Sequence, residues 1–284
     1  MAQKPPPIFS ARQRKLRLER AARNFSAHDF LHIRVAEDAV DRLETVQKSF
    51  QRALFIGPGA PLLAQRLTEA CDVAQVTIAG ESAQFLKAAG ADAPVECDAA
   101  SLPFADGAFD LVVSLMHLHT ENDLPGALVE ARRVLEPDGL FIASFPAERT
   151  LVGFREALRN AEVQVTGGVA PRVAPMVAIK DAGALLQRAG FALPVVDLQP
   201  VNVRYRNPFT LIQDLRGMGE TLPLASARPP LRREVLAAAL AAMEGQETVF
   251  EIGVLTGWSP HESQPRPLKP GSAKVSMADV IGKG

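Results

Sequence analysis

Hydrophobic residues recur at two different spacings in the first half of the chain. Between residues 30 and 50 they follow one another at three- and four-residue steps, which predicts an amphipathic helix. Short apolar runs come next, and helical stretches separate them. The predicted strands are residues 53–56, 75–79, 94–98, 109–116 and 140–145, and the predicted helices are residues 61–71, 82–89 and 124–135. Strands that alternate with helices indicate βαβ crossovers and a mainly parallel sheet.

The second half of the chain predicts further strands at the edge of this sheet. A turn predicted at Pro137-Asp138-Gly139 leads into the last strand of the first half, residues 140–145. The predicted strands of the second half are residues 191–198, 201–205 and 249–256, and its predicted helices are residues 181–189, 209–218 and 231–243. The last two helices form an insertion of the kind that covers the ligand-binding ends of strands. We therefore expect an α/β fold with a doubly wound, mostly parallel seven-stranded sheet.

Three parts of one chain follow from this pattern. Residues 1–50 are expected to be a basic arm and leading helix, residues 51–200 the core, and residues 201–284 the insertion, final strand and tail of the same domain. A chain of 284 residues with 47% hydrophobic composition can bury a sizeable core.

Charge and hydropathy argue against two classes of partner. The net charge is −1, and no apolar run approaches the ~20 residues that span a bilayer, so we expect neither bulk nucleic-acid binding nor a transmembrane segment. Cys71 and Cys97 lack metal-ligand spacing and are expected to be small buried residues in a reducing compartment. The first residues lack the apolar core of a secretory signal, which favours the cytoplasm.

Basic residues are concentrated at the N-terminus. The first 23 residues contain seven lysines and arginines and one acid, Glu19. A solvated leading helix is the simpler interpretation. An arm that contacts an acidic partner or lipid headgroups is one alternative, and an organelle presequence is another.

A glycine turn, Gly57-Pro58-Gly59, separates the first predicted strand from its helix. Glycine permits the tight backbone angles of such a turn and lets a ligand approach the main chain. The third glycine of the dinucleotide fingerprint is missing, and Pro61 lies nearby instead, which favours a smaller adenosyl ligand over a dinucleotide. The alternative is an ordinary turn with no ligand.

A combination of motifs resembles the class I S-adenosylmethionine-dependent methyltransferases. The motifs are the glycine turn, Asp98 after the third strand, Leu102-Pro103-Phe104 with Phe109-Asp110, and Leu135-Glu136-Pro137-Asp138-Gly139. The resemblance implies that Asp98 faces the adenine and that the glycine turn approaches the methionine portion. It implies the Rossmann-like methyltransferase fold and S-adenosylmethionine as cofactor. The implied cofactor-binding residues are Gly57, Gly59, Thr77, Ala79, Asp98, Ala99 and Leu115.

A fuller resemblance covers almost the whole chain. Its segments are residues 119–126, 167–171, 185–191, 214–219, 257–264 and 270–272. They are similar to the bacterial relatives of a mitochondrial complex I assembly factor, and more distantly to the carrier-protein methyltransferase of biotin synthesis. The resemblance implies an enzyme of the methyltransferase fold that modifies a protein, with a subunit of respiratory complex I as the implied partner. Two alternatives are an arginine hydroxylase and an assembly factor that has lost its cofactor.

Several positions depart from the family pattern. Phe55 stands where the family has an acid, Pro61 where it has a glycine, and Thr120 where it has tryptophan. No acid occurs in residues 77–80, where a carboxylate should hold the ribose hydroxyls, although Glu81 serves if the strand runs one or two residues further. We therefore expect weak binding of S-adenosylmethionine.

Candidate chemistry follows the fourth strand. In an extended chain His117 and His119 point to opposite sides, so His119 is expected to line the site and His117 to be packed or exposed. Asn122 and Asp123 are candidate catalytic residues, and they are equally suited to cap the helix at Leu124. We expect no metal site, because the two histidines lack an adjacent acid or cysteine at suitable spacing.

The remaining prediction concerns the partner. The insertion between residues 209 and 243 and the basic residues between 12 and 23 are expected to form a surface above the site that binds a protein.

Overall fold

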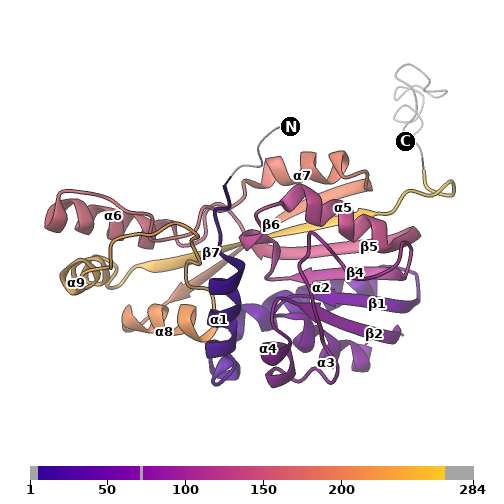
Figure 1. The fold of residues 1–284 in the computed structure, drawn as a ribbon, viewed down its shortest axis with the longest axis horizontal. Coiled ribbons are helices and arrows are strands. Elements are labelled where there is room, and N and C mark those ends of the chain that lie inside the picture. Colours follow the sequence, from indigo (N-terminus) through magenta and orange to yellow (C-terminus); the bar gives the residue numbers. More distant parts are fainter. Residues whose placement is uncertain (1–5, 71–72, 266–284) are drawn as a thin grey trace, which may run out of the picture.

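The computed structural model describes residues 6–70 and 73–265. Within these residues the chain forms a seven-stranded sheet in the order β3-β2-β1-β4-β5-β7-β6. β7 is antiparallel to both of its neighbours, and the other strands run parallel to one another (Figure 1). The predicted doubly wound, mostly parallel seven-stranded sheet is confirmed.

Most elements lie where the hydrophobic pattern predicts them. The strands are β1 Phe50–Ile56, β2 Val73–Gly80, β3 Val95–Glu96, β4 Phe109–Leu115, β5 Leu135–Pro146, β6 Ala192–Arg204 and β7 Glu247–Trp258. The α-helices are α1 Ala11–Ala21, α2 Phe30–Thr45, α3 Ala60–Ala70, α4 Ala83–Ala88, α5 Leu124–Val134, α6 Val152–Thr166, α7 Ile179–Arg188, α8 Phe209–Gly217 and α9 Arg233–Ala242.

The core has two layers because successive residues of a buried strand face opposite sides of the sheet. On β1, Ala53 and Phe55 join a hydrophobic cluster with α2 and α3, whereas Leu54 joins a second cluster with α5 and α7. Every residue of β4 is buried. A central strand covered on both faces reads as one continuous apolar run, which is why its position could be predicted.

Three local features differ from the sequence prediction. The Pro137-Asp138-Gly139 segment lies inside β5 and does not form a separate turn. The pairing of β5 with β4 shifts register there, and Asp138 has a positive φ of 63°. The two strands predicted around Pro200 are one 13-residue strand, β6. Its place at the sheet edge tolerates a proline, which lacks a donor for a second neighbour. α6 was not predicted.

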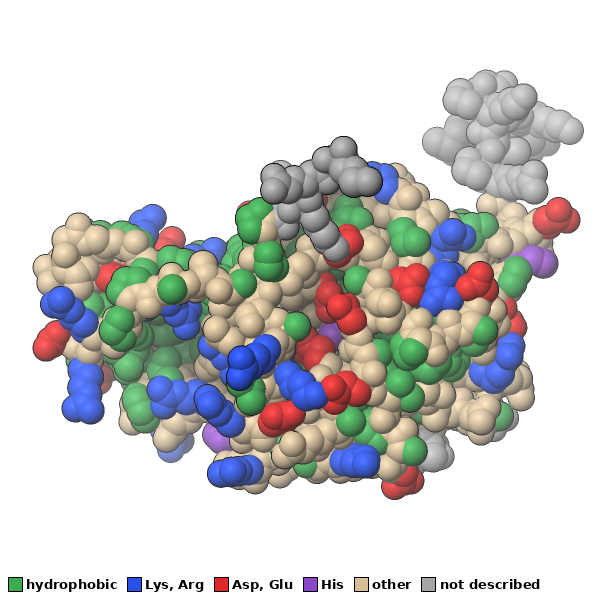
Figure 2. Space-filling view, in the orientation of Figure 1, with side chains coloured by type: hydrophobic (Ala, Val, Ile, Leu, Met, Phe, Trp, Pro, Cys, Tyr) green, Lys and Arg blue, Asp and Glu red, His purple; other side chains and the backbone are tan. Residues whose placement is uncertain are grey.

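The basic N-terminal segment is packed onto the body of the chain. Leu18 and Ala21 of α1 and Phe25 form a cluster with Phe85 and Leu86 from α4. α1 thus lies between α8 and the strand ends (Figure 1). On the face in Figure 2, acidic side chains border the basic ones over α1.

Two further expectations concern cysteines and membranes. Cys97 is half-buried and has no disulfide, whereas Cys71 lies outside the described residues. None of the described helices has the length and apolar character needed to cross a membrane.

Candidate active site

The glycine turn connects β1 to α3 and packs against the end of β4. Gly57 has a φ of +98°, and its N–H donates to the carbonyl of Ala79 at 2.9 Å. A Cβ at Gly57 would lie 2.5 Å from the Leu115 carbonyl oxygen and 2.8 Å from the Cβ of His117. The turn therefore requires glycine both for its backbone angles and for close approach to β4.

We expect Gly57→Ala to destabilise the chain more than Gly167→Ala does. Gly167 also has a positive φ, +72°, but a Cβ there meets nothing within 4 Å. Gly167→Ala should cost about 1–2 kcal/mol in backbone conformation, and Gly57→Ala should cost a further 1–3 kcal/mol or so because the main chain must shift. Urea denaturation of both variants measures the difference, and equal midpoints would contradict the steric explanation.

The acid at the end of β2 is Glu81. β2 continues through Gly80, which pairs with β3, so Glu81 is the first residue beyond the strand. β2 thus runs one residue past its predicted end at residue 79, which is the alternative in which Glu81 is the acid at the strand end. Thr77 lies in mid-strand opposite Leu54, and Ala79 is fully buried in the core.

Three strand ends meet at the same edge of the sheet. The Cys97 N–H donates to the Gly80 carbonyl at 3.0 Å, and the bond from Gly57 to Ala79 links β1 to β2. Asp98 follows β3 and accepts a hydrogen bond from the Ala100 N–H at 2.9 Å. Ala99 is buried in the core behind it. The structure thus brings the glycine turn, Glu81 and Asp98 to one edge.

Arg14 of α1 enters this edge as a buried guanidinium, with only 1% of the residue exposed. Its Nε lies 3.3 Å from Glu81, and one Nη lies 2.9 Å from Glu220. It also donates to the carbonyl oxygens of Gly219 and Met116 at 3.1 and 3.3 Å. Burial alone would lower the pKa of Arg14, but the carboxylates of Glu220 and Glu81 outweigh it and raise the pKa.

Glu220 joins Arg14 to His119. One carboxylate oxygen contacts Arg14 and the other lies 2.8 Å from Nε2 of His119. Burial raises the pKa of Glu220, but the charge of Arg14 and the contact with His119 hold it well below its ordinary value. Glu220 is therefore a largely buried, ionised group that positions His119.

The chain is not extended at the two histidines, as the prediction assumed, although His117 is packed inside and His119 borders the cavity described below. β4 ends at Leu115, Met116 has a positive φ of 57°, and residues 118–120 form a 3₁₀ turn. His117 is completely buried, 3.7 Å from Glu81 and 3.2 Å from Glu121. Burial lowers the pKa of His117, but the neighbouring carboxylates, Glu81 foremost, raise it well above its ordinary value.

Glu81, His117 and Glu121 offer donor atoms that all lie within 4.8 Å of one another, so they could hold a metal ion. His117 therefore does have an acid at suitable spacing, contrary to the expectation from the sequence, because Glu121 lies four residues further along the chain and contacts it. The Arg14 guanidinium beside Glu81 already supplies a positive charge there and would repel a second cation.

Asn122 and Asp123 have structural contacts. The Gly126 N–H donates to Asp123 at 2.9 Å, which caps α5. Asn122 accepts from the Phe9 N–H and donates to the Phe9 carbonyl, both at 2.9 Å, and so fixes the segment before α1. Neither residue lines the cavity described next, and their catalytic role stays a prediction.

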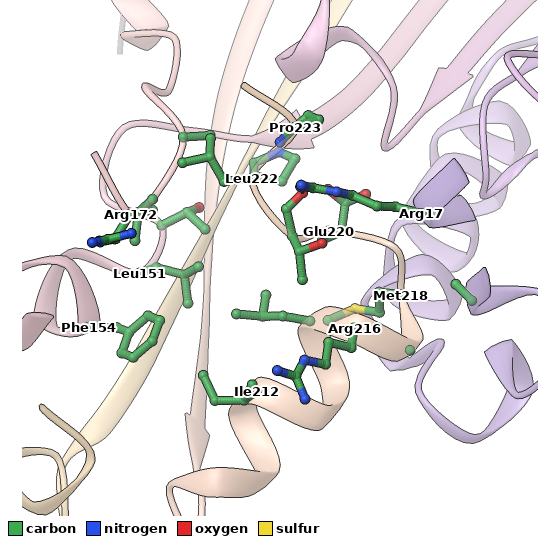
Figure 3. Close-up of a pocket in the computed structure, with 18 of the residues that line it drawn as sticks. Arg17, Leu151, Phe154, Arg172, Ile212, Arg216, Met218, Glu220, Leu222 and Pro223 are labelled. Carbon is green, nitrogen blue, oxygen red and sulfur yellow. The ribbon is translucent and has the colours of Figure 1, made fainter. Parts of the chain in front are cut away.

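A cavity of about 960 Å³ adjoins His119 and Glu220 (Figure 3). Residues from α1, α6, α8 and the loops around residues 172 and 228 line it. Gly57, Gly59 and Asp98 lie at the sheet edge and are not among its lining residues, whereas His119 is. α1 and Arg14 lie between the two regions because the arm that was expected on the surface folds inward.

Sequence reasoning missed the network of Arg14, Glu81 and Glu220. Arg14 was one of seven similar basic residues, and its acidic partners lie 67 and 206 residues away in the chain. The segment of residues 214–219 was singled out, but its successor Glu220 carried no separate signal.

The amino-acid sequence is similar to those of known proteins. Residues 54–143 match the model of a methyltransferase domain. The chain is 38% identical to arginine-hydroxylase NDUFAF5, mitochondrial, of Danio rerio over 91% of its own length and 84% of that protein. It is 33% identical to the Homo sapiens protein of the same name, over 93% and 81% of the two chains. A malonyl-[acyl-carrier protein] O-methyltransferase of Gallionella capsiferriformans is 30% identical over 70% and 71%.

Solved structures agree on the fold. The YcgJ protein of Bacillus subtilis superposes with a TM-score of 0.53 at 15% identity, over 79% of this chain and 99% of that one. A Bacillus halodurans protein superposes with a TM-score of 0.54 at 15% identity, over 79% and 98%. The chain belongs to the arginine-hydroxylase NDUFAF5 family, and with it to the class I S-adenosylmethionine-dependent methyltransferase superfamily.

Proposed function

We propose that this chain is an enzyme that modifies an arginine side chain of a protein substrate, with S-adenosylmethionine bound at the glycine turn. The observation that carries the proposal is the guanidinium site around Glu220. Two carboxylates and two carbonyl oxygens hold the chain's own Arg14 there, and two of these partners, Glu220 and Met116, also line the cavity of about 960 Å³. A subunit of respiratory complex I is the substrate that the family resemblance implies.

The residues at the strand ends fit the cofactor by type. A glycine turn, the carboxylate of Glu81 and Asp98 lie at one edge of the sheet, and a carboxylate has about four acceptor sites, so Glu81 can bind Arg14 and still accept the ribose hydroxyls. When bound, S-adenosylmethionine supplies an electrophilic methyl group.

His119 is the proton acceptor in this proposal. Its Nε2 faces the Glu220 carboxylate at 2.8 Å, which favours the tautomer with the proton on that nitrogen. Its buried Nδ1 has no hydrogen-bond partner among the described residues. That nitrogen is free to take the proton that a guanidinium loses on modification.

We expect Glu81→Gln to weaken the binding of S-adenosylmethionine by about tenfold to 150-fold, because charge-assisted hydrogen bonds to the ribose are worth about 1.5–3 kcal/mol. Isothermal titration calorimetry measures the affinity. Glu121→Gln is the matched control, since Glu121 also contacts His117 but does not follow β2. Equal losses in both variants would contradict a ribose role for Glu81.

Mass spectrometry of an acceptor protein tests the proposed function. The chain is incubated with S-adenosylmethionine and an arginine-containing acceptor, and a product heavier by one CH₂ group at an arginine is the result expected for methylation. A gain of one oxygen atom would instead indicate hydroxylation, the reaction in the relatives' name, which needs an added oxidant. If S-adenosylmethionine does not bind and the mass of the acceptor does not change, the enzymatic proposal is contradicted and the alternative of an assembly factor without catalytic activity is favoured.

A further inference from the structure

Arginines surround the cavity beside His119. Arg17, Arg20, Arg172, Arg216 and Arg228 line it, and Glu220 is the single acid among the described residues that do so. Glu220 is already paired with Arg14 and His119. In the described part of the chain Arg172 forms an ion pair with Glu162, whereas the other four have no acid within ion-pair distance.

The rim arginines also repel one another. Burial lowers the pKa of Arg17, and the charges of Arg228, Arg14 and Arg20 lower it further. Burial and the charge of Arg172 lower the pKa of Arg228. Like charges held together in a partly buried site store repulsion that a negatively charged ligand relieves.

The walls between these arginines are apolar. Leu151 and Phe154 line one side, and Ile212 and Met218 line another (Figure 3). Figure 2 shows hydrophobic side chains in the recess between α1 and the lobe of α6 and α9, with basic side chains around it. A ligand that fits therefore combines an apolar part with negative charge.

The positions of the arginines indicate how the negative charge is distributed. Arg17 and Arg172 lie on opposite sides of the cavity, and Arg216 comes from α8 (Figure 3). A small amphipathic anion such as a fatty acid has one head group and can pair with one side of this rim. A peptide segment with acidic residues on both sides of an apolar residue can pair with several arginines at once.

We propose that the cavity binds a segment of the substrate protein in which acidic and apolar residues flank the target arginine. This inference rests on the proposed function. The apolar side chain fills the interior, the flanking carboxylates pair with the rim arginines, and the target guanidinium reaches Glu220. The flanking acids also offset the repulsion that an arginine would otherwise meet at this rim.

Fluorescence polarisation with two labelled peptides tests the proposal, without S-adenosylmethionine. Both peptides contain one arginine and two leucines, and one carries four glutamates where the other carries four glutamines. We expect the glutamate peptide to bind at least about tenfold more tightly, and its advantage to shrink at high salt. Arg20→Gln and Arg216→Gln, both on exposed side chains, should each weaken it by about threefold.

The control variant is Arg159→Gln, which removes an exposed arginine of α6 outside the cavity lining and should leave binding unchanged. Equal binding of the two peptides, or equal losses in all three variants, would overturn the proposal. Displacement of the glutamate peptide by a single-chain fatty acid whose own binding depends on Arg20 and Arg216 would overturn it in favour of a small anion.

Failure of the proposed function gives a different result. A glutamate peptide that binds as expected but is never modified would remove the enzymatic proposal and leave the binding inference standing. Modification of the glutamate and glutamine peptides at equal rates would remove the binding inference and leave the enzymatic proposal standing.

Discussion

Replacement of Arg14 by methionine is expected to lower the free energy of unfolding by about 3–5 kcal/mol, because it leaves two largely buried carboxylates without their cation. Methionine keeps much of the length and apolar volume of the side chain, so the loss reports the charge. Glu220 and Glu81 would both lose their contact with the guanidinium, and the Gly219 and Met116 carbonyls would lose a donor.

Chemical denaturation of Arg14→Met, Glu220→Gln and the double variant measures this coupling. The double variant should be destabilised by less than the sum of the two single variants, because the contact is already lost in either one. Arg12→Met is the control, since Arg12 lies on the same helix with an exposed side chain. A loss at Arg14 no larger than at Arg12 would show that the buried network contributes little.

The strands of the fold could be predicted from the sequence, whereas the burial of Arg14 at the site could not. β4 is apolar except for Asp110 and Ser114, and β1 is followed directly by its glycine turn, so local patterns were enough to locate them. Arg14 carries no local signal, because its burial depends on acids from β2 and from the segment after α8 that meet only in the folded chain.

The surroundings of the two histidines also could not be predicted from the sequence alone. Alternation of His117 and His119 assumed an extended chain, but the positive φ of Met116 turns the backbone directly after β4. Both rings are buried, and each faces a different acid. Glu81, by contrast, was identified from the sequence as a candidate acid, and only the end of β2 was predicted wrongly.

Replacement of His119 by glutamine is expected to slow modification of the acceptor arginine by about 10²–10⁴-fold, the usual contribution of a positioned general base. Glutamine can still donate a hydrogen bond to Glu220 in place of Nε2 but cannot take a proton. The loss should therefore appear in kcat, while KM for the acceptor and the affinity for S-adenosylmethionine change little.

Initial rates over a range of acceptor concentrations separate these quantities, and a thermal melt confirms that the variant is folded. His261→Gln, which alters an exposed histidine after β7, is the control for loss of an imidazole. An unchanged kcat in His119→Gln would exclude His119 as the proton acceptor. A rise in KM with kcat unchanged would instead assign His119 to binding of the acceptor, because the buried pair with Glu220 would then serve recognition of the guanidinium without moving its proton.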